Sequence, residues 1–209
     1  MYAPQQFKEE RVEVLCSAMR SIQLAALVSP TASGIEISHV PMVVKEEAGR
    51  VLLETHVARA NPHWRVINAG VASVAIFQGP QAYVTPSWYP SKKEHGKVVP
   101  TWTYIAVHAH GMLASVTDEA WLRAHLDDLT RANEAAREEP WNLSDAPASF
   151  TASLRRGIVG LRLTVDRVEG SWKINQHKNE ADKAGTAQGL ASSGEMGREL
   201  ASYLTAPTG

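Results

Sequence analysis

Hydrophobic residues along the chain recur at two spacings, one typical of helices and one typical of strands. From Glu9 to Arg20 they fall every three or four positions, which predicts an amphipathic helix with Cys16 on its apolar side. After this helix, apolar runs and alternating stretches are separated by turn-forming residues, a pattern that favours strands. The predicted strands are Ile22 to Ser29, Gly34 to Val44, Val51 to Val57, Val71 to Phe77, Val98 to His108 and Ile158 to Val168. We expect Gly79-Pro80 to end the strand that begins at Val71.

Helical spacing returns in two later segments. Thr117 is the predicted N-cap of a helix, because acidic residues follow it in the first turn. The apolar face of this helix consists of Trp121, Leu122, His125, Leu126 and Leu129. Residues 181–204 are rich in Ala and Gly and predict a weaker helix, divided near Gly194. Between these helices, Glu138 to Phe150 contains a tryptophan and two prolines and is predicted to be an ordered loop.

The order of these elements indicates the fold class. Strands joined by turns and seldom by helices favour an antiparallel barrel or sandwich over a doubly wound parallel sheet. With 209 residues, no internal repeat and no low-complexity linker, the chain is predicted to form one domain over 1–209, with a helical extension from about residue 178. The predicted fold is therefore mainly β, with peripheral helices.

Composition and charge narrow the functional classes. The chain has 21 basic and 22 acidic residues, a formal net charge of -1, and its basic residues are scattered. DNA-binding proteins usually carry a basic stripe, so direct DNA binding is not expected. We see no signal peptide and no apolar run long enough to span a membrane, and the single cysteine cannot form an internal disulfide. The expected location is the cytoplasm.

Several common catalytic motifs are absent. The chain has no G-x-S-x-G nucleophile motif, no complete Walker loop around Gly96-Lys97, and no G-x-G-x-x-G dinucleotide motif. No residue is a convincing general acid or base, although His108 or His39 could serve. Whether the protein is an enzyme is therefore left open by its sequence.

Histidines raise the question of a metal. His108 and His110 are two residues apart, so on a strand both side chains lie on one face, and His39 or His56 is a conceivable third ligand. No spacing guarantees that three ligands converge. Buried or ligand-facing histidines are the favoured interpretation, and no metal site is predicted.

The segment from Thr55 to Trp64 has the composition of an anion-binding turn. A strand is followed by Arg59, then by Asn61 as N-cap and Pro62 at the first position of a short helix. Free backbone N–H groups at a helix start and an arginine suit a phosphate monoester. A strand-to-helix junction whose arginine pairs with a carboxylate explains the same spacing equally well.

Two aromatic segments follow. Residues 77–92 contain three prolines and four aromatic residues, which predicts a stiff loop that either stacks on a planar ligand, fills a dimer interface or packs on the core. In the strand from Val98 to His108 and on to His110, alternation places one row of side chains on one face: Trp102, Tyr104, Ala106, His108 and His110. This face suits a groove for a heteroaromatic ring.

These segments, in this order, resemble the PaiB family of FMN-binding split-barrel proteins. The resemblance covers Met1 to about Gln176 and rests on the stretches HVARANPHW, IFQGPQAYVTPSWYPSK, VVPTWTYIAVHAHG and WNLSDAP. It implies a split β-barrel like that of the pyridoxamine-phosphate-oxidase-like flavoproteins, a homodimer, and FMN in a cleft at the subunit interface. It also implies the family's general description, an FMN-binding negative transcriptional regulator.

The resemblance and the anion-site argument together suggest the cofactor-binding residues. Arg59, Asn61 and His56 are the expected phosphate contacts, with His39 facing the same pocket; Lys92 adds a positive charge, and Trp102 flanks the isoalloxazine. Two segments depart from the family pattern. Thr103 replaces the Asn of T-W-N-Y, and Lys173-Ile174-Asn175-Gln176-His177-Lys178 stands where the family usually has K-[LM]-S-Q-N-R.

Three functions remain open. The first is a flavin-binding regulator that acts through flavin or redox sensing. The second is an FMN-dependent oxidoreductase or flavin reductase that uses NAD(P)H, in which the cofactor supplies the hydride chemistry. The third and weakest is haem binding through a histidine.

Overall fold

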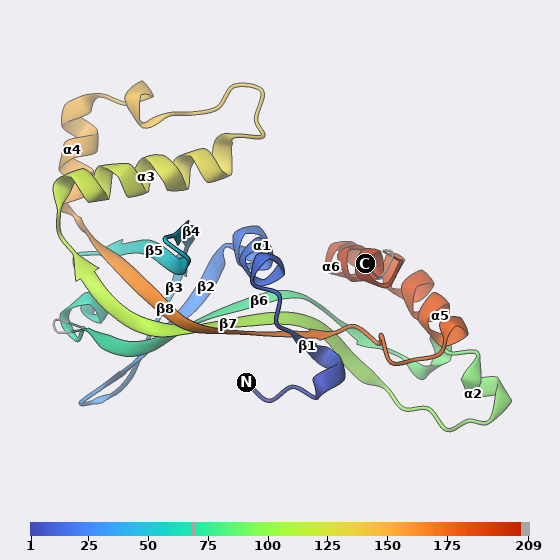
Figure 1. Ribbon diagram of the computed structural model, residues 1–209. Coiled ribbons are helices and arrows are strands. Elements are labelled where there is room, and N and C mark those ends of the chain that lie inside the picture. Colours follow the sequence, from blue (N-terminus) through green and yellow to red (C-terminus); the bar gives the residue numbers. More distant parts are fainter. Residues whose placement is uncertain (68–69, 206–209) are drawn as a thin grey trace. The chain divides into compact units, whose positions relative to one another are not determined.

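The computed structural model describes residues 1–67 and 70–205 (Figure 1). The strands in this part of the chain are β1 (Lys8–Glu9), β2 (Leu24–Thr31), β3 (Gly34–Pro41), β4 (Val43–Glu47), β5 (Arg50–Ala58), β6 (Val71–Val84), β7 (Thr101–Val116) and β8 (Ile158–Lys173). They form a sheet in the order β3-β2-β6-β7-β8-β5-β4, and β1 pairs with β8. The pairings β1–β8, β2–β3, β2–β6, β4–β5 and β5–β8 are antiparallel. The predicted antiparallel fold is confirmed.

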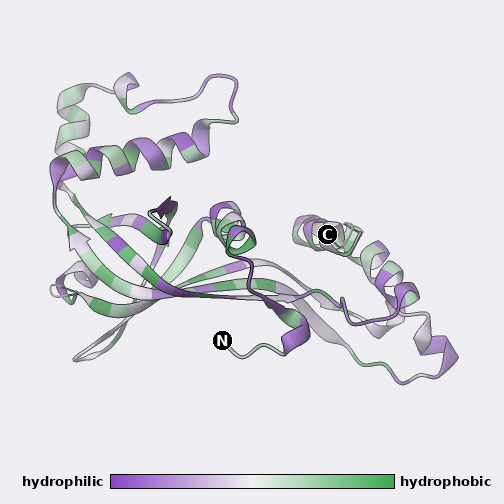
Figure 2. Ribbon diagram, viewed as in Figure 1, coloured by the Kyte–Doolittle hydropathy of each residue, from purple (hydrophilic) through white to green (hydrophobic). Residues whose placement is uncertain are grey.

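Helices accompany the sheet, as predicted. The α-helices are α1 (Val12–Ile22), α2 (Ser91–Glu94), α3 (Glu119–Glu134), α4 (Ala148–Arg156), α5 (Glu180–Ala191) and α6 (Gly194–Thr205). Short 3₁₀ turns are η1 (Gln5–Phe7), η2 (Pro62–Arg65), η3 (Pro86–Trp88) and η4 (Leu143–Asp145). Figure 2 shows hydrophilic and hydrophobic residues alternating around α3. None of these helices is both long enough and apolar enough to cross a membrane.

Burial follows the predicted patterns. On β7, Thr103, Ile105, Val107 and Ala109 are buried, whereas the residues between them are exposed or half-buried. Cys16 is fully buried on α1. The break between α5 and α6 falls at Gly194, whose φ of 84° is strained for any other residue.

Several predicted boundaries are wrong. Strand β6 runs through Gly79-Pro80 to Val84, because a proline is tolerated in a strand wherever its missing N–H is not needed for pairing. The predicted strand from Gly34 to Val44 divides into β3 and β4 at Met42. Asp118, not Thr117, is the N-cap of α3, and its side chain accepts a hydrogen bond from the Trp121 N–H. Helix α4 begins inside the predicted loop.

Contacts divide the chain into two compact units. The larger unit comprises residues 16–77 and 108–168 and is centred on buried aliphatic side chains of β2, β5 and β8, such as Leu27, Leu53 and Leu161. The smaller unit comprises residues 1–15, 78–107 and 169–209. Its core includes Tyr89, Ile105, Leu190 and Leu200. The prediction of a single domain stays a prediction.

Candidate functional site

Arg59 is fixed by the backbone where α4 ends and β8 begins. Its N–H donates to the Gly157 carbonyl at 2.7 Å. Its guanidinium donates from Nε to the Arg156 carbonyl at 2.8 Å and from Nη2 to the Ile158 carbonyl at 3.1 Å. The side chain is exposed and has no acidic partner among the described residues. The guanidinium is therefore held in one orientation while Nη1 and the second Nη2 hydrogen stay available to an anion.

Two more arginines belong to this corner of the larger unit. Trp64 Nε1 donates to the Arg59 carbonyl at 2.9 Å, and the Arg65 guanidinium lies 5.4 Å from the Trp64 ring centroid. Arg156 supplies a carbonyl to the Arg59 guanidinium, and its own side chain is exposed. In the part of the chain that the structure describes, none of these three arginines forms an ion pair. The surface is locally cationic although the whole chain is nearly neutral.

Asn61 caps the turn after Arg59, as predicted. The helix is the four-residue 3₁₀ turn η2, with Pro62 at its start. The Asn61 side chain accepts from the His63 N–H at 2.9 Å through Oδ1 and donates to Ser38 Oγ at 3.0 Å through Nδ2. The Asn61 side chain therefore ties the turn to β3, and one Nδ2 hydrogen remains.

His63 lies at the centre of a buried polar network that the sequence did not predict. Its Nδ1 is 3.0 Å from Ser38 Oγ and its Nε2 is 2.8 Å from Ser29 Oγ. Ser29 in turn contacts Ser73 Oγ at 2.7 Å, and Ser73 donates to the Val71 carbonyl. Because the single Ser73 hydrogen is used there, Ser29 donates to Ser73 and accepts from His63.

This order of donors determines the tautomer of the His63 ring. His63 carries its proton on Nε2, and its Nδ1 accepts from the Ser38 hydroxyl. Burial lowers the pKa of His63. The network therefore holds a neutral imidazole that fastens η2 to β2, β3 and β6.

His56, a predicted phosphate contact, faces α3. Its Nδ1 is 3.0 Å from Nε2 of His125, which is completely buried. The His125 ring stacks on Trp121 with 5.2 Å between centroids and an angle of 9°. Burial lowers the pKa of both histidines, and that of His125 falls to about 4, with the neighbouring His56 contributing to its shift.

A buried carboxylate completes the contact between α3 and the sheet. Glu54 is inaccessible to solvent, accepts from Arg162 at 2.6 Å and from Trp121 Nε1 at 3.2 Å, and faces Lys45 Nζ at 3.0 Å. Lys45 also pairs with Asp128 of α3 at 2.9 Å. Burial alone raises the pKa of Glu54, but Lys45 and Arg162 outweigh it, so the net shift is downward.

The other predicted contacts lie elsewhere. His39 is exposed on β3, opposite Ala26, and points away from the buried Ser38 that Asn61 contacts. In the smaller unit, Lys92 is exposed on α2 and donates to Ser87 Oγ at 2.9 Å. Trp102 is 54% exposed and meets Tyr83 edge to face, with 6.3 Å between centroids. The structure thus brings Arg59 and Asn61 into one turn next to the strand that carries His56, and places His39 on another face.

Thr103 and Asn175, one from each segment that departs from the family pattern, are both buried in the smaller unit. Thr103 is inaccessible to solvent, and its Oγ1 has no hydrogen-bond partner within the described residues. Asn175 has a φ of 63°, a left-handed conformation that asparagine tolerates well, and donates to the Tyr89 hydroxyl at 3.0 Å. Both side chains contribute to the interior of this unit.

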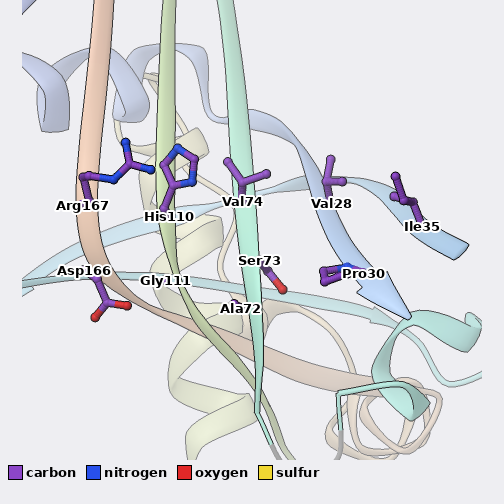
Figure 3. Close-up of a pocket in the computed structure, with 10 residues that line it drawn as sticks. All are labelled: Val28, Pro30, Ile35, Ala72, Ser73, Val74, His110, Gly111, Asp166 and Arg167. Carbon is purple, nitrogen blue, oxygen red and sulfur yellow. The ribbon is translucent and has the colours of Figure 1, made fainter. Parts of the chain in front are cut away.

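A pocket of about 440 Å³ lies on the larger unit (Figure 3). Figure 3 shows five side chains in a row across β8, β7, β6, β2 and β3: Arg167, His110, Val74, Val28 and Ile35. Its volume is within the range of small-molecule sites, and its wall is mostly apolar. Four residues of the larger unit were predicted to contact the cofactor, and none of them lines this pocket: His39, His56, Arg59 and Asn61.

His108 and His110 lie on the same face of β7, as predicted, with ring centroids 6.3 Å apart. The described residues contain no group in which His39 or His56 joins them as a third metal ligand.

The sequence did not predict that His63 is the centre of a buried network, nor that His125 is the partner of His56. The i, i+4 spacing of Trp121 and His125 placed both on one helix face, but nothing in that spacing says which strand the face meets. His63 lies in the predicted anion-binding segment, but nothing in the sequence of that segment indicates that its ring is buried.

Comparisons with known proteins agree with this architecture. The fold is similar to that of a FAD and heme binding protein from Mycobacterium smegmatis, with a TM-score of 0.59, 17% identity and coverage of 79% of this chain and 73% of that one. It is also similar to the flavocytochrome Anf3 from Azotobacter vinelandii, with a TM-score of 0.53, 10% identity and coverage of 88% and 78%. These likenesses define the class of fold: a split-barrel protein with an antiparallel sheet and accompanying helices.

Comparison of the amino-acid sequence with known families identifies the family of this chain. Residues 1–167 match the family described as "Putative FMN-binding domain", and the chain belongs to it. It is 29% identical to the Bacillus subtilis protease synthase and sporulation protein PAI 2, with coverage of 87% of this chain and 85% of the relative. The predicted resemblance to PaiB proteins is confirmed.

Proposed function

We propose that this protein binds FMN and that the Arg59 guanidinium holds the phosphate. The observation that carries the proposal is that two backbone carbonyls fix this guanidinium at a cationic corner, while it has no acidic partner among the described residues. A phosphate dianion there meets free N–H donors without displacing any existing partner. The residues present therefore fit the phosphate of FMN.

Other residues have supporting roles in this proposal. Asn61 orders the turn after Arg59 through η2 and donates its remaining Nδ2 hydrogen, and His56 offers its Nε2. His39 and Lys92 stay proposals from the family resemblance as further contacts, as does Trp102 as the residue that flanks the ring system. When bound, FMN supplies reversible one- and two-electron redox chemistry.

We propose a regulatory role of the PaiB type, as a negative transcriptional regulator that senses flavin or redox state. Similarity to PAI 2 and membership in the family support it. The net charge of -1 suggests that any effect on transcription is exerted without extensive contact to DNA phosphates.

A second function is favoured by one observation. The pocket beside His110 has room for a small molecule, which an FMN-dependent oxidoreductase or flavin reductase using NAD(P)H needs in addition to its cofactor.

We also propose a homodimer. Leu24, Ile35 and Ile37 are 56%, 69% and 55% exposed on β2 and β3. Apolar patches of this kind on a sheet are usually covered by a partner. A second copy of the chain is the proposed partner.

The test is a titration of the purified protein with FMN, followed by flavin fluorescence. Replacing Arg59 with Ala is expected to weaken binding about tenfold or more, the effect of losing one charge-assisted phosphate contact. Arg123→Ala, which removes an exposed arginine from α3, is the matched control. Equal affinity of both variants, or no binding by the unmodified protein, would refute the proposal.

NAD(P)H oxidation by the FMN-loaded protein then separates an oxidoreductase from a regulator without turnover.

A further inference from the structure

His125 on α3 is buried and has one polar partner. Its Nε2 meets His56 Nδ1 at 3.0 Å, whereas its Nδ1 is buried and has no hydrogen-bond partner among the described residues. A neutral imidazole carries one hydrogen, so one nitrogen of each ring donates and the other accepts. Only two arrangements of protons are compatible with a hydrogen bond between these two neutral rings.

The two arrangements differ in what is left unpaired. If His56 donates, His125 must carry its hydrogen on Nδ1, which leaves a buried N–H without an acceptor. If His125 donates from Nε2, its Nδ1 is an unpaired acceptor. Among backbone groups, orphaned buried N–H groups are rarer than under-satisfied carbonyl acceptors, and we extend this order to the imidazole nitrogens. The second arrangement is favoured, and in it His56 Nδ1 accepts and His56 Nε2 carries the hydrogen.

His56 Nε2 is accessible. The ring is half-buried, Nε2 has no partner within the described chain, and it is not one of the buried atoms that lack a partner. We propose that His125 is a positioning residue, which fixes His56 as the tautomer that donates from Nε2 to an anionic ligand. This inference rests on the proposed function, in which that ligand is the FMN phosphate.

The surroundings of His125 keep it in place. Trp121 stacks on its ring and packs on Gly160, which lies opposite His56 in the β5–β8 pairing. Lys45 and Asp128 connect the next turn of α3 to β4. A rigid donor at this position acts on the ligand site through His56 without touching the ligand.

The first measurement needs no ligand. A two-bond ¹H–¹⁵N correlation spectrum of the apo-protein above pH 8 reports the protonated nitrogen of each histidine. His56 is expected as a single tautomer with protonated Nε2. His95 is an internal reference, because its Nδ1 accepts from the Lys97 N–H. Protonated Nδ1, or an averaged signal, at His56 would overturn the inference.

Variants of His125 provide the second measurement. The His125→Leu variant has no donor at this position, so we expect mixed tautomers of His56 and a three- to tenfold loss of FMN affinity. His125→Gln retains an N–H donor and is expected to restore both the single tautomer and most of the affinity. A leucine variant that is folded by near-UV circular dichroism and keeps the original tautomer and affinity would contradict the inference. If the unmodified protein binds no FMN, the proposed function fails, while the apo-protein spectrum still decides the tautomer.

Discussion

At the scale of single residues, the turn after Arg59 depends on side chains that never reach the surface. Ser38 is the hub, since it donates to His63 Nδ1 and accepts from Asn61 Nδ2. Buried hydrogen bonds therefore fix the shape of the turn that lies next to a ligand at Arg59.

Replacement of Ser38 by Ala is expected to lower the free energy of unfolding by about 1–3 kcal/mol, because it leaves His63 Nδ1 buried without a partner. Urea denaturation measures this change. Ser33→Ala removes an exposed hydroxyl that contacts Thr31 and should change stability by less than about 0.5 kcal/mol. Equal stability of the two variants would show that the network contributes little.

At the scale of elements, the packing of α3 on β8 depends on Gly160, which has no side chain. A Cβ at position 160 would lie 2.1 Å from the Trp121 ring. Gly160→Ala should therefore push Trp121 away from β8, lower the free energy of unfolding by about 1–3 kcal/mol and shift tryptophan fluorescence. Gly157→Ala is the control, since Gly157 has a φ of -83° and its Cβ would lie 3.2 Å from its nearest neighbour. Unchanged fluorescence in the Gly160 variant would contradict this account.

Elements with a strong local signal were predictable, and contacts between elements were not. The cap at Asn61 and the break at Gly194 depend on the residues next to them, and both predictions are confirmed. The length of β6 depends on pairing with other strands, which let it continue through Gly79-Pro80. Pairing of His56 with His125 joins residues 69 positions apart, and no periodicity encodes it.

At the scale of the whole molecule, two buried histidines, His63 and His125, and the half-buried His56 make stability depend on pH. Burial lowers the pKa of His56, His63 and His125 in the folded protein, to about 4 for His125. Below their ordinary pKa of 6.5 these side chains gain protons in the unfolded chain first. The contribution of these histidines to the free energy of unfolding is complete above about pH 6.5 and should be lost as the pH falls below that value. His125 accounts for about 1.4 kcal/mol per pH unit until the pH reaches its folded pKa of about 4, and His56 and His63 add to the fall in the same direction.

Chemical denaturation at about pH 7.5 and at about pH 5, on either side of the ordinary histidine pKa, measures this fall. His125→Gln removes one titrating group, so the difference between the two pH values should shrink in that variant. Stability that is the same at both pH values in the unmodified protein would show that the three rings are accessible to protons in the folded state.

The hydrogen bonds of the Arg59 guanidinium join positions 97 and 99 residues apart in the chain. Closing so long a loop costs entropy that short-range contacts do not, so contacts of this kind tend to form late in folding. A ligand that binds only once they exist stabilises the native state more than the transition state. On the proposed function, in which that ligand is FMN, the cofactor should prolong the lifetime of the folded protein by slowing its unfolding, while the rate of folding changes little.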